Sequence, residues 1–506
     1  MNLSPTSLTA AGKFAWARYH WLALGLVVIA AIALRLQGLD RTLTVDEAWT
    51  VAAATAPDFW ATARKDVHPP LYYYLVRLVW MSADSFTALR LFSVGCGLGL
   101  LALVLVAFRK NPVAALVAGA AVAGLPGFVL FSQQLRSYSL LLLLLAVALV
   151  LAVRIFQGAT DLRARILLSV VLALAAATHL ITVFFLLALA PLLFWPARAG
   201  PARGWFAALL PLGPPGLLAL GLKFYFITPP ETLGGGWWMT VDTTTVLRAL
   251  GEAVGWNEMP WLADAWSRHA PGNGWPVLAG ALAAVLIALG TAWSRRPSHP
   301  LVWPLLFSAI IYTIGVISYS CLFEHVIMMR TLLPGLLPFL ASLALGIGSH
   351  PVSWRRSVAA AAVFSYVAMA ATPVSRRATV PDAGLRGLVA ATNAVCRPGD
   401  LLLVFRAMDY SLAAYQCPPP GTEVLFFDQT VAAEPQLAGL KKRLGRLDHS
   451  RRVLVVYRDD YYLRQFRGVF DKALAEISRH GWKPGPGGWV ELDLGLIVTG
   501  PAATAP

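Results

Sequence analysis

The sequence predicts a multispan α-helical membrane protein with a small external α/β domain at its C-terminus. The 506 residues are 58% hydrophobic and only 13% charged, and the mean hydropathy is +0.64. A soluble domain ordinarily has a charged fraction of about 25%. Because a helix of roughly 20 apolar residues crosses the hydrocarbon core of a bilayer, most of this chain is expected to lie in lipid.

About eleven apolar stretches qualify as transmembrane helices by length and hydropathy. The first is followed by bulky and charged residues and not by a small-residue cleavage site, so we expect it to remain as an anchor. The fifth and sixth are short and could instead form one long tilted segment, but the alternation of Arg clusters favours two crossings. The stretches are 21–36, 86–107, 113–131, 139–156, 166–178, 181–195, 205–226, 275–293, 301–319, 331–349 and 356–372.

The net charge of +15 is distributed as in a membrane protein and does not indicate a nucleic-acid partner. Basic residues cluster in every second loop, which is the positive-inside pattern and places residues 1–20 in the cytoplasm. The protein is therefore expected in the cytoplasmic (inner) membrane, with a membrane domain over 21–372 and residues 373–506 outside. The clusters contain Lys13, Arg18, Arg109, Lys110, Arg154, Arg163, Arg165, Arg198, Arg203, Arg295, Arg296, Arg355 and Arg356.

Six cations break this pattern because they lie in or beside the first external loop, 37–85. Either the loop is structured enough to be translocated regardless of charge, or its cations serve an anionic ligand at the outer surface. The six are Arg35, Arg41, Arg64, Lys65, Arg77 and Arg90.

The first external loop also holds the most informative polar residues of the chain. Asp46 and Glu47 follow the first span closely, and a His-Pro-Pro-Leu-Tyr run begins at His68 and includes Tyr72. A carboxylate at the point where a helix leaves the hydrocarbon is costly unless it has a partner or a task. Acid, histidine and aromatic residues gathered at one membrane surface predict the catalytic part of a membrane enzyme.

Two later external turns carry residues suited to a phosphorylated sugar. Arg136 offers a planar fork of donors that fits phosphate, and Gln133 and Tyr138 can orient sugar hydroxyls. An Arg at the end of a span can also snorkel to lipid headgroups. Arg330 opens a late span on the same side of the membrane. His179, at another external corner, reads as a capping or hydrogen-bonding residue and not as a ligand.

The region after residue 373 predicts a small α/β domain with a largely parallel sheet, because short apolar runs at 400–405, 423–427 and 452–457 alternate with helix-like segments. Cys396 and Cys417 fall in this domain, where either a disulfide or two free thiols can be expected. No Cys or His spacing predicts a zinc site. The Gly95-x-Gly97-x-Gly99 run lies in an apolar span and indicates close helix packing.

These motifs, in this order, resemble the multispan C-type (GT-C) glycosyltransferases. The matching features are the acidic pair after the first span, the His-Pro-Pro-Leu-Tyr run, the Gln-x-x-Arg-x-Tyr turn before the fourth span, and Arg-x-Leu-x-Pro at the start of a late span. The resemblance covers about residues 20–350. It is strongest to the family 39-like branch that contains protein O-mannosyltransferases, lipid A aminoarabinose transferases and core galacturonosyltransferases.

The resemblance implies transfer of a sugar from a polyprenyl-phosphate donor to a lipid, glycan or protein acceptor outside the cytoplasmic membrane. It implies that Asp46 is catalytic, with Glu47 as a neighbour and substitute, and that Arg330 and Arg136 contact the lipid phosphate. Relatives often carry an acidic residue where this chain has Gln133 or Gln134, so the resemblance implies no second carboxylate and no metal role in that turn. No cofactor is implied; carboxylates are present for a divalent metal, but no clustered set indicates one.

The predicted chemistry needs one carboxylate, because a phosphate leaves without the strong general acid that glycosidases require. Asp46 would accept the proton of the acceptor hydroxyl, with inversion at the sugar. A transporter or lipid flippase is the alternative, since many spans and an acid–histidine pair also suit proton-coupled transport. Against it, the polar residues gather at the outer surface and the two halves show no internal repeat. A non-catalytic scaffold would leave the order of the motifs unexplained.

Overall fold

The chain divides into two compact units. The first comprises Met1–Leu39, Asp66–Ile227 and Trp238–Val380, and the second comprises Asp40–Lys65, Thr228–Trp237 and Pro381–Pro506. The computed structural model describes residues 10–41, 43–64, 68–83, 85–158, 162–194, 210–226, 242–256, 274–294, 299–323, 326–379, 394, 396–405, 421–427, 433–446, 452–456, 461–480, 482–484 and 496–501.

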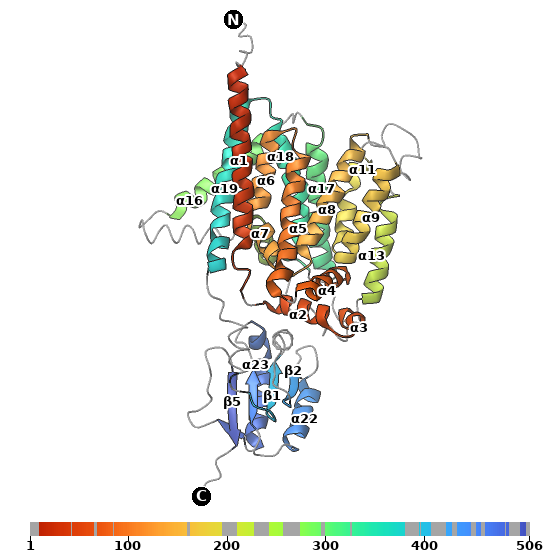
Figure 1. Cartoon of the computed structure of the whole chain (residues 1–506), viewed down its shortest axis with the longest axis vertical. Helices are drawn as coiled ribbons and strands as arrows, with labels where there is room; N and C mark the ends of the chain where they lie inside the picture. Colours follow the sequence, from red (N-terminus) through yellow and green to blue (C-terminus); the bar gives the residue numbers. More distant parts are fainter. Residues whose placement is uncertain are drawn as a thin grey trace. The chain divides into compact units, whose positions relative to one another are not determined.

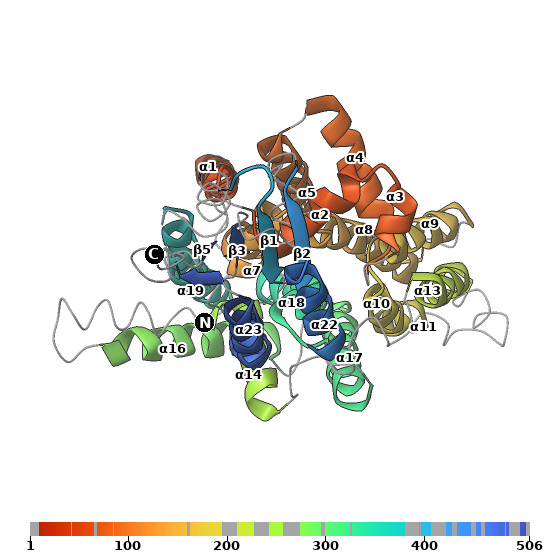
Figure 2. The same cartoon turned by 90° about the horizontal axis from the view of Figure 1, so that it is seen from below.

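The first unit is a bundle of apolar helices, most of which have nearly aligned axes (Figure 1). Its helices pack through one continuous apolar core of Ala, Leu and Val side chains. The view from the end of the bundle shows α9 beside α13 and α17 near α18 (Figure 2). The helices are α1 (Ala10–Leu36), α4 (Leu71–Ala83), α5 (Phe86–Ala107), α6 (Pro112–Gly124), α7 (Pro126–Gln133), α8 (Tyr138–Phe156), α9 (Leu162–Thr178), α10 (Thr182–Ala188), α11 (Ala190–Phe194), α13 (Gly213–Phe226), α14 (Thr243–Val254), α16 (Gly274–Ala292), α17 (Val302–Leu322), α18 (Met329–Gly348) and α19 (Ser353–Thr379).

The prediction of a multispan membrane protein is confirmed. In the part of the chain that the structure describes, four helices (α5, α8, α17 and α18) are long and apolar enough to cross a membrane, and the α6–α7 pair makes a fifth if it is one span. Shorter apolar helices occupy His20–Leu36, Thr182–Phe194 and Ala279–Ala292. Each predicted stretch overlaps a helix, and 166–178 and 181–195 fall on different helices. The total of eleven crossings stays a prediction.

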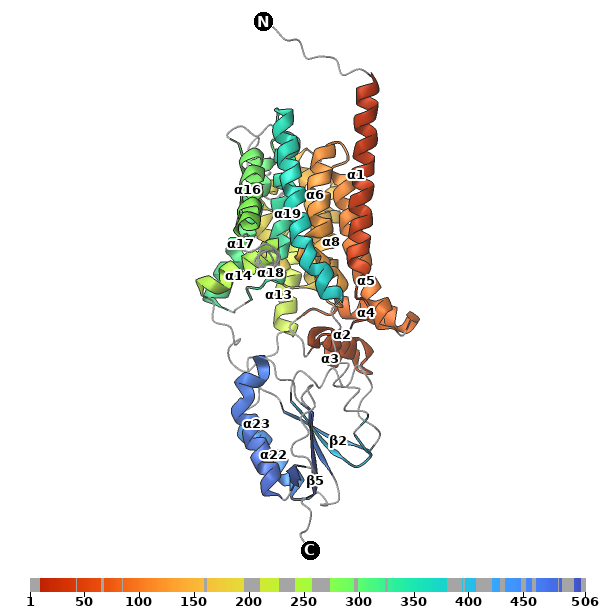
Figure 3. The ribbon, with the colours of Figure 1, turned by 90° about the vertical axis from the view of Figure 1, so that its left-hand side faces the viewer.

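The predicted span over 113–131 contains a sharp bend, because α6 and α7 are separate helices that meet at an angle of 53°. Leu125 adopts an extended backbone between them, and Pro126 is the first residue of α7. Proline has no backbone N–H and clashes with the preceding turn, so a helix is interrupted there. α6 lies beside α1 and α19, and α16 lies beside α19 (Figure 3).

Close helix packing at the Gly95-x-Gly97-x-Gly99 run is confirmed at its centre and wrong at its first position. A Cβ built on Gly97 would lie 2.5 Å from the Cβ of Ser132 in α7. A Cβ on Gly99 would make an ordinary contact of 3.4 Å with Leu143, and a Cβ on Gly95 would meet nothing within 4 Å. Only the glycine that faces α7 is therefore required by packing.

The second unit contains a five-stranded sheet of order β2-β1-β3-β5-β4, built from β1 (Leu401–Phe405), β2 (Glu423–Phe427), β3 (Val453–Val456), β4 (Trp482–Pro484) and β5 (Leu496–Pro501). The three predicted strands pair in parallel, β1 with β2 and with β3. Of the five described strands, β5 has the opposite direction, since it runs antiparallel to both β3 and β4. The sheet is mixed because its last two strands form a returning pair.

Helices α22 (Ala433–Leu444) and α23 (Tyr461–Arg479) alternate with these strands, as the sequence predicts. Leu440, Phe470 and Ile477 from the helices bury their side chains against Leu403 and Val455 of the sheet. The unit also includes two short helices from the predicted first external loop, α2 (Val45–Thr55) and α3 (Phe59–Ala63).

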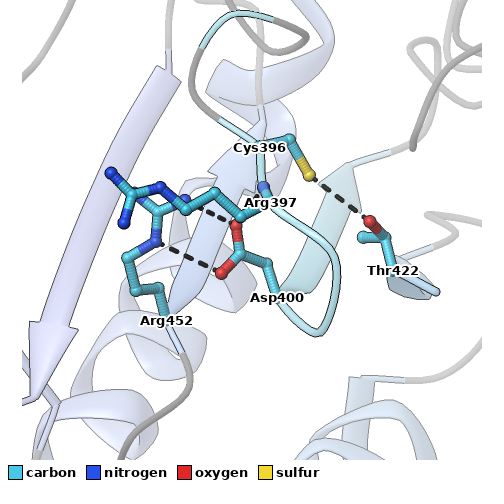
Figure 4. A network of polar contacts seen from close by, with 5 residues as sticks. All are labelled: Cys396, Arg397, Asp400, Thr422 and Arg452. Carbon is cyan, nitrogen blue, oxygen red and sulfur yellow. Dashed lines mark hydrogen bonds and ion pairs between the residues drawn. The ribbon is translucent and has the colours of Figure 1, made fainter. Parts of the chain in front are cut away.

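A partly buried ion pair joins the residues that directly precede β1 and β3 (Figure 4). Arg452 donates from Nη2 to Oδ2 of Asp400 at 2.7 Å and from Nε to Oδ1 at 3.2 Å. Asp400 also accepts the backbone N–H of Arg397 at 2.6 Å, which closes the turn before β1. Cys396 is a buried free thiol whose sulfur lies 3.6 Å from the Thr422 hydroxyl. Cys417, its predicted disulfide partner, lies outside the described residues.

Candidate functional site

Tyr138 is the centre of an aromatic and cationic group at one end of the first unit. It is the first residue of α8 and is only 2% exposed. The ring of Phe131, from α7, packs against it with centroids 5.0 Å apart. The guanidinium carbon of Arg330, in the first turn of α18, lies 5.6 Å from the Tyr138 ring centroid. This separation is within the range of a cation–π interaction, which holds the guanidinium close to the ring.

Two histidines complete this group. The rings of His68 and His179 meet edge to face with centroids 4.7 Å apart. His179 lies 5.3 Å and His68 6.4 Å from the Tyr138 ring. We call His68, Tyr138, His179 and Arg330 the histidine–tyrosine cluster. Its members come from the loop before α4, the start of α8, the end of α9 and the start of α18, so four distant segments converge on one point.

The structure assigns the proton of neutral His179. Nδ1 accepts a hydrogen bond of 3.2 Å from the backbone N–H of Ile181. A ring nitrogen that accepts carries no proton, so the neutral imidazole has its N–H at Nε2. The carbonyl of His179 in turn accepts the Thr182 hydroxyl at 2.8 Å, which holds the corner between α9 and α10. His179 is therefore fixed at this corner through both its ring and its carbonyl.

The start of α18 is held in place by residues next to Arg330. The buried hydroxyl of Tyr312, in α17, donates to the carbonyl of Thr331 at 2.7 Å. Thr331 Oγ1 accepts the backbone N–H of Met328 at 2.9 Å and so closes the first turn of the helix. A Cβ on Gly335 would lie 2.7 Å from the Tyr312 ring, so α17 and α18 approach closely at this level. These contacts hold the first turn of α18, and with it the backbone of Arg330, in a fixed position against α17.

Three other predicted site residues lie near this region. Gln133 donates from Nε2 to the carbonyls of Leu34 at 2.6 Å and Gln37 at 3.0 Å, which ties α7 to the end of α1. The Tyr72 hydroxyl pairs with Ser93 Oγ at 3.0 Å and joins α4 to α5. Arg136 is buried, 5% exposed, in the turn between α7 and α8. Gln133 and Tyr72 therefore have structural partners besides any role toward a substrate.

The acidic pair belongs to the second unit, at the start of α2. Thr44 caps this helix, and its hydroxyl accepts the N–H of Glu47 at 3.3 Å. The Glu47 carboxylate accepts the N–H of Thr44 at 2.8 Å. This reciprocal pair is a capping box, in which both side chains satisfy backbone donors at a helix end. Glu47 is fully buried and engaged in the cap, whereas Asp46 is half-buried at the second position of the helix.

Two of the six cations that depart from the positive-inside pattern have structural roles. Arg35 is fully buried and donates to the carbonyls of Val122 at 2.7 Å and Ala123 at 3.0 Å. Arg90 is also fully buried and donates to the carbonyl of Leu39 at 2.8 Å. For these two residues the structure favours the first alternative, an ordered segment that uses its cations internally. Across the described residues, no three His, Cys, Asp or Glu side chains form a group that could hold a metal ion.

Comparisons with known proteins identify the architecture. No family model matches the chain, and no curated protein matches it. ArnT from Cupriavidus metallidurans, solved with bound undecaprenyl phosphate, aligns over 97% of this chain and 99% of its own, with a TM-score of 0.54 and 13% identity. This chain has the fold of the C-type glycosyltransferases.

Two further GT-C structures align at lower similarity. The apo form of the same ArnT aligns over 96% of this chain and 98% of its own, with a TM-score of 0.44 and 14% identity. An Archaeoglobus fulgidus oligosaccharyltransferase, tethered to an acceptor peptide, aligns over 93% of this chain and 73% of its own, with a TM-score of 0.49 and 11% identity. The fold assignment depends on the first match.

Within this GT-C fold, His179 is the one member of the cluster that the sequence did not predict as a site residue. The signal available was its position, directly after Thr178 at the end of a predicted span. Nothing in the sequence shows that this corner meets His68, because the six helices α4 to α9 lie between the two residues in the chain. The fold brings them together, so a residue read as a simple cap lies among the predicted site residues.

Proposed function

We propose that this chain is a membrane glycosyltransferase that moves a sugar from a polyprenyl-phosphate donor to an acceptor on the outer side of the cytoplasmic membrane. The observation that carries the proposal is the histidine–tyrosine cluster in a chain with the GT-C fold. Arg330, held over Tyr138 at 5.6 Å, presents a fixed positive charge at the ring against which two imidazoles also pack. Such a group suits a phosphate that becomes more negative as it leaves.

The reaction forms one bond and breaks one bond at the anomeric carbon of the sugar. The oxygen of the acceptor hydroxyl attacks this carbon, and the bond from the carbon to the phosphate oxygen breaks. The lipid phosphate keeps the electron pair, and the hydroxyl proton passes to the carboxylate of Asp46. Attack opposite the leaving group inverts the configuration. A positioned base of this kind contributes about 10²–10⁴-fold to the rate.

In this scheme two arginines interact with the phosphate of the donor. Arg330 and Arg136 stabilise the growing charge of the phosphate, and a guanidinium binds phosphate with two parallel hydrogen bonds. Preorganised charges in a poorly hydrated site reduce the barrier because they need no rearrangement during the reaction. The undecaprenyl phosphate bound to the ArnT structure supports a lipid phosphate as the donor carrier. The Arg clusters between spans support a cytoplasmic N-terminus.

Donor turnover by the purified full-length chain tests this proposal. Undecaprenyl phosphates carrying neutral, acidic and amino sugars are incubated with the chain in lipid nanodiscs, with a membrane extract as the source of acceptors. Wild type is expected to consume one of these donors. The variants Asp46→Asn and Arg330→Ala are expected to leave the same donor unreacted. Arg355→Ala is the matched control, since Arg355 also stacks on an aromatic ring, Trp354 at 5.4 Å, but is exposed at the start of α19.

Each outcome has a definite meaning for the assignment. Full turnover by Asp46→Asn removes Asp46 from the role of base. Equal losses in Arg330→Ala and Arg355→Ala indicate a general effect of charge and not a phosphate contact. If wild type consumes no donor but moves a lipid-linked sugar across a vesicle membrane, the chain is a transporter and the proposal fails.

A further inference from the structure

The corner between α7 and α8 holds three buried polar atoms that the protein does not pair. They are Oε1 of Gln133, Oγ of Ser137 and Oγ of Ser139, and none has a hydrogen-bond partner among the residues that the structure describes. The three residues are 1%, 4% and 3% exposed. A buried polar atom without a partner costs free energy and is rare in native structures. Three such atoms lie within seven positions of one another at this corner.

The amide of Gln133 is fixed in one orientation. Its Nε2 donates to two carbonyl oxygens, those of Leu34 and Gln37. A flipped amide would place its own oxygen against both carbonyls and would lose both bonds. Oε1 therefore faces away from α1 as a buried acceptor that requires a donor.

The two serines differ from most other buried serines of this bundle. Ser132 donates to the Val129 carbonyl at 2.7 Å, Ser308 to Pro304 at 2.9 Å and Ser342 to Val302 at 2.7 Å. Each hydroxyl in this group is satisfied by a nearby backbone carbonyl. Ser137 takes the N-cap position of α8 but makes no side-chain cap bond, and Ser139 makes no bond to a carbonyl. Ser320, in the last turn of α17, is a further exception.

Tyr138 connects these two serines to the proposed chemistry. It lies between them in the sequence, and its ring lies 5.6 Å from the guanidinium of Arg330, which the proposed function places on the donor phosphate. The sugar of the donor is bonded directly to that phosphate. A sugar hydroxyl both donates and accepts, so it can satisfy a serine hydroxyl and an amide oxygen alike.

We infer that Ser137 and Ser139, together with Gln133 Oε1, bind hydroxyl groups of the donor's sugar and so help to select which sugar is transferred. This inference rests on the proposed function and assigns binding roles to two serines that the motifs do not single out. A site that hydrogen-bonds a substrate hydroxyl rejects an analogue lacking it, because its buried polar groups are then left unpaired.

The inference predicts opposite effects on stability and on binding. Without donor, Ser137→Ala or Ser139→Ala removes an unpaired buried hydroxyl, so Tm is expected to stay equal or to rise. With donor, the same change removes one hydrogen bond, and KM for the donor is expected to rise by about tenfold. A serine with a purely structural role would give the reverse pattern. Ser308→Ala is the matched control, because its buried hydroxyl is already paired; it should lower Tm and leave KM unchanged.

The experiment measures Tm without donor, and KM for donor and for acceptor, in the full-length chain and the three variants. Wild type is also tested with donors that each lack one sugar hydroxyl, which requires no variant to fold. A rise in donor KM with unchanged or higher Tm, and a matching penalty for at least one deoxygenated donor, supports the inference.

Three results overturn it. Unchanged donor KM in both serine variants, while wild type turns over its donor, removes the serines from the sugar site and leaves the proposed function standing. A rise in acceptor KM alone assigns the serines to the acceptor. A lowered Tm, as in Ser308→Ala, shows that structural water or protein pairs these hydroxyls. If wild type turns over no donor, the proposed function fails first and this inference fails with it.

Discussion

Arg35 donates a hydrogen bond of 2.7 Å to the carbonyl oxygen of Val122, the acceptor that Pro126 leaves without its helical partner. In a continuous helix, the N–H four residues later would bond this oxygen, but proline has none. A second bond from Arg35, of 3.0 Å, reaches the Ala123 carbonyl. Both carbonyls belong to the last turn of α6, where helix carbonyls lack internal partners. A guanidinium buried in the bundle thus completes a broken helix.

Arg35→Met is expected to reduce the free energy of unfolding, because it leaves two buried carbonyls without donors at about 1–3 kcal/mol each. Pro126→Ala restores an N–H at the position that faces Val122. The cost of Arg35→Met should therefore be smaller in the Pro126→Ala background, and a double-mutant cycle of Tm values in detergent measures the difference. Arg355→Met, at an exposed Arg, controls for loss of a cation. Equal costs in both backgrounds would disprove the coupling.

Asp46 and Glu47 are expected to respond differently to loss of charge. Glu47→Gln keeps an oxygen that can accept the Thr44 N–H, so α2 should keep its cap and turnover should stay close to wild type. Asp46→Asn removes the proposed base and should reduce kcat by about 10²–10⁴-fold. Both variants are compared by donor consumption and by Tm. The opposite order of activities would transfer the catalytic role to Glu47.

The two glycines at the start of the Gly-x-Gly-x-Gly run of α5 provide a matched test of packing. Gly97→Ala places a methyl group 2.5 Å from the Ser132 Cβ, and overpacking of this kind costs about 1–3 kcal/mol. Gly95→Ala meets nothing within 4 Å and should be neutral or stabilising by up to about 1 kcal/mol through helix propensity. Thermal unfolding of both variants measures the contrast. Equal Tm values would show that α5 and α7 separate easily.

Burial raises the pKa of the Cys396 thiol above its ordinary value. The neutral thiol therefore stabilises the folded unit at pH values below the ordinary thiol pKa, and this contribution is lost as pH rises through the raised pKa of the folded state. Since the thiolate is the nucleophile, Cys396 should be alkylated slowly at mildly alkaline pH until the chain is unfolded.

Mass spectrometry of the alkylated chain, digested under non-reducing conditions, checks this expectation. Cys321, whose side chain is exposed, is the internal reference. Labelling of Cys396 at the rate of Cys321 would contradict the burial of this thiol. Recovery of Cys396 in a disulfide would contradict its free state.

Two structural features that were not predicted are nevertheless indicated by the sequence. Thr44 and Glu47 stand in the spacing of a capping box, which predicts a structural role for Glu47 from the sequence alone. Pro126, inside an apolar stretch, is a known position for a break. The mixed sheet had no such signal, because the direction of β5 depends on which strand it pairs with and not on its own composition.

The sequence by itself determined that this chain is a multispan membrane protein with an α/β unit after its last apolar stretch. Apolar runs long enough to cross a bilayer, and short apolar runs that alternate with amphipathic helical segments, are local patterns that specify these two features. Only the tertiary structure decided that His179 meets His68, that Arg330 lies over Tyr138, and that Arg35 replaces the bond that Pro126 cannot make. These contacts join residues far apart in the chain, and their partners are chosen by how the helices pack against one another, which no local pattern records.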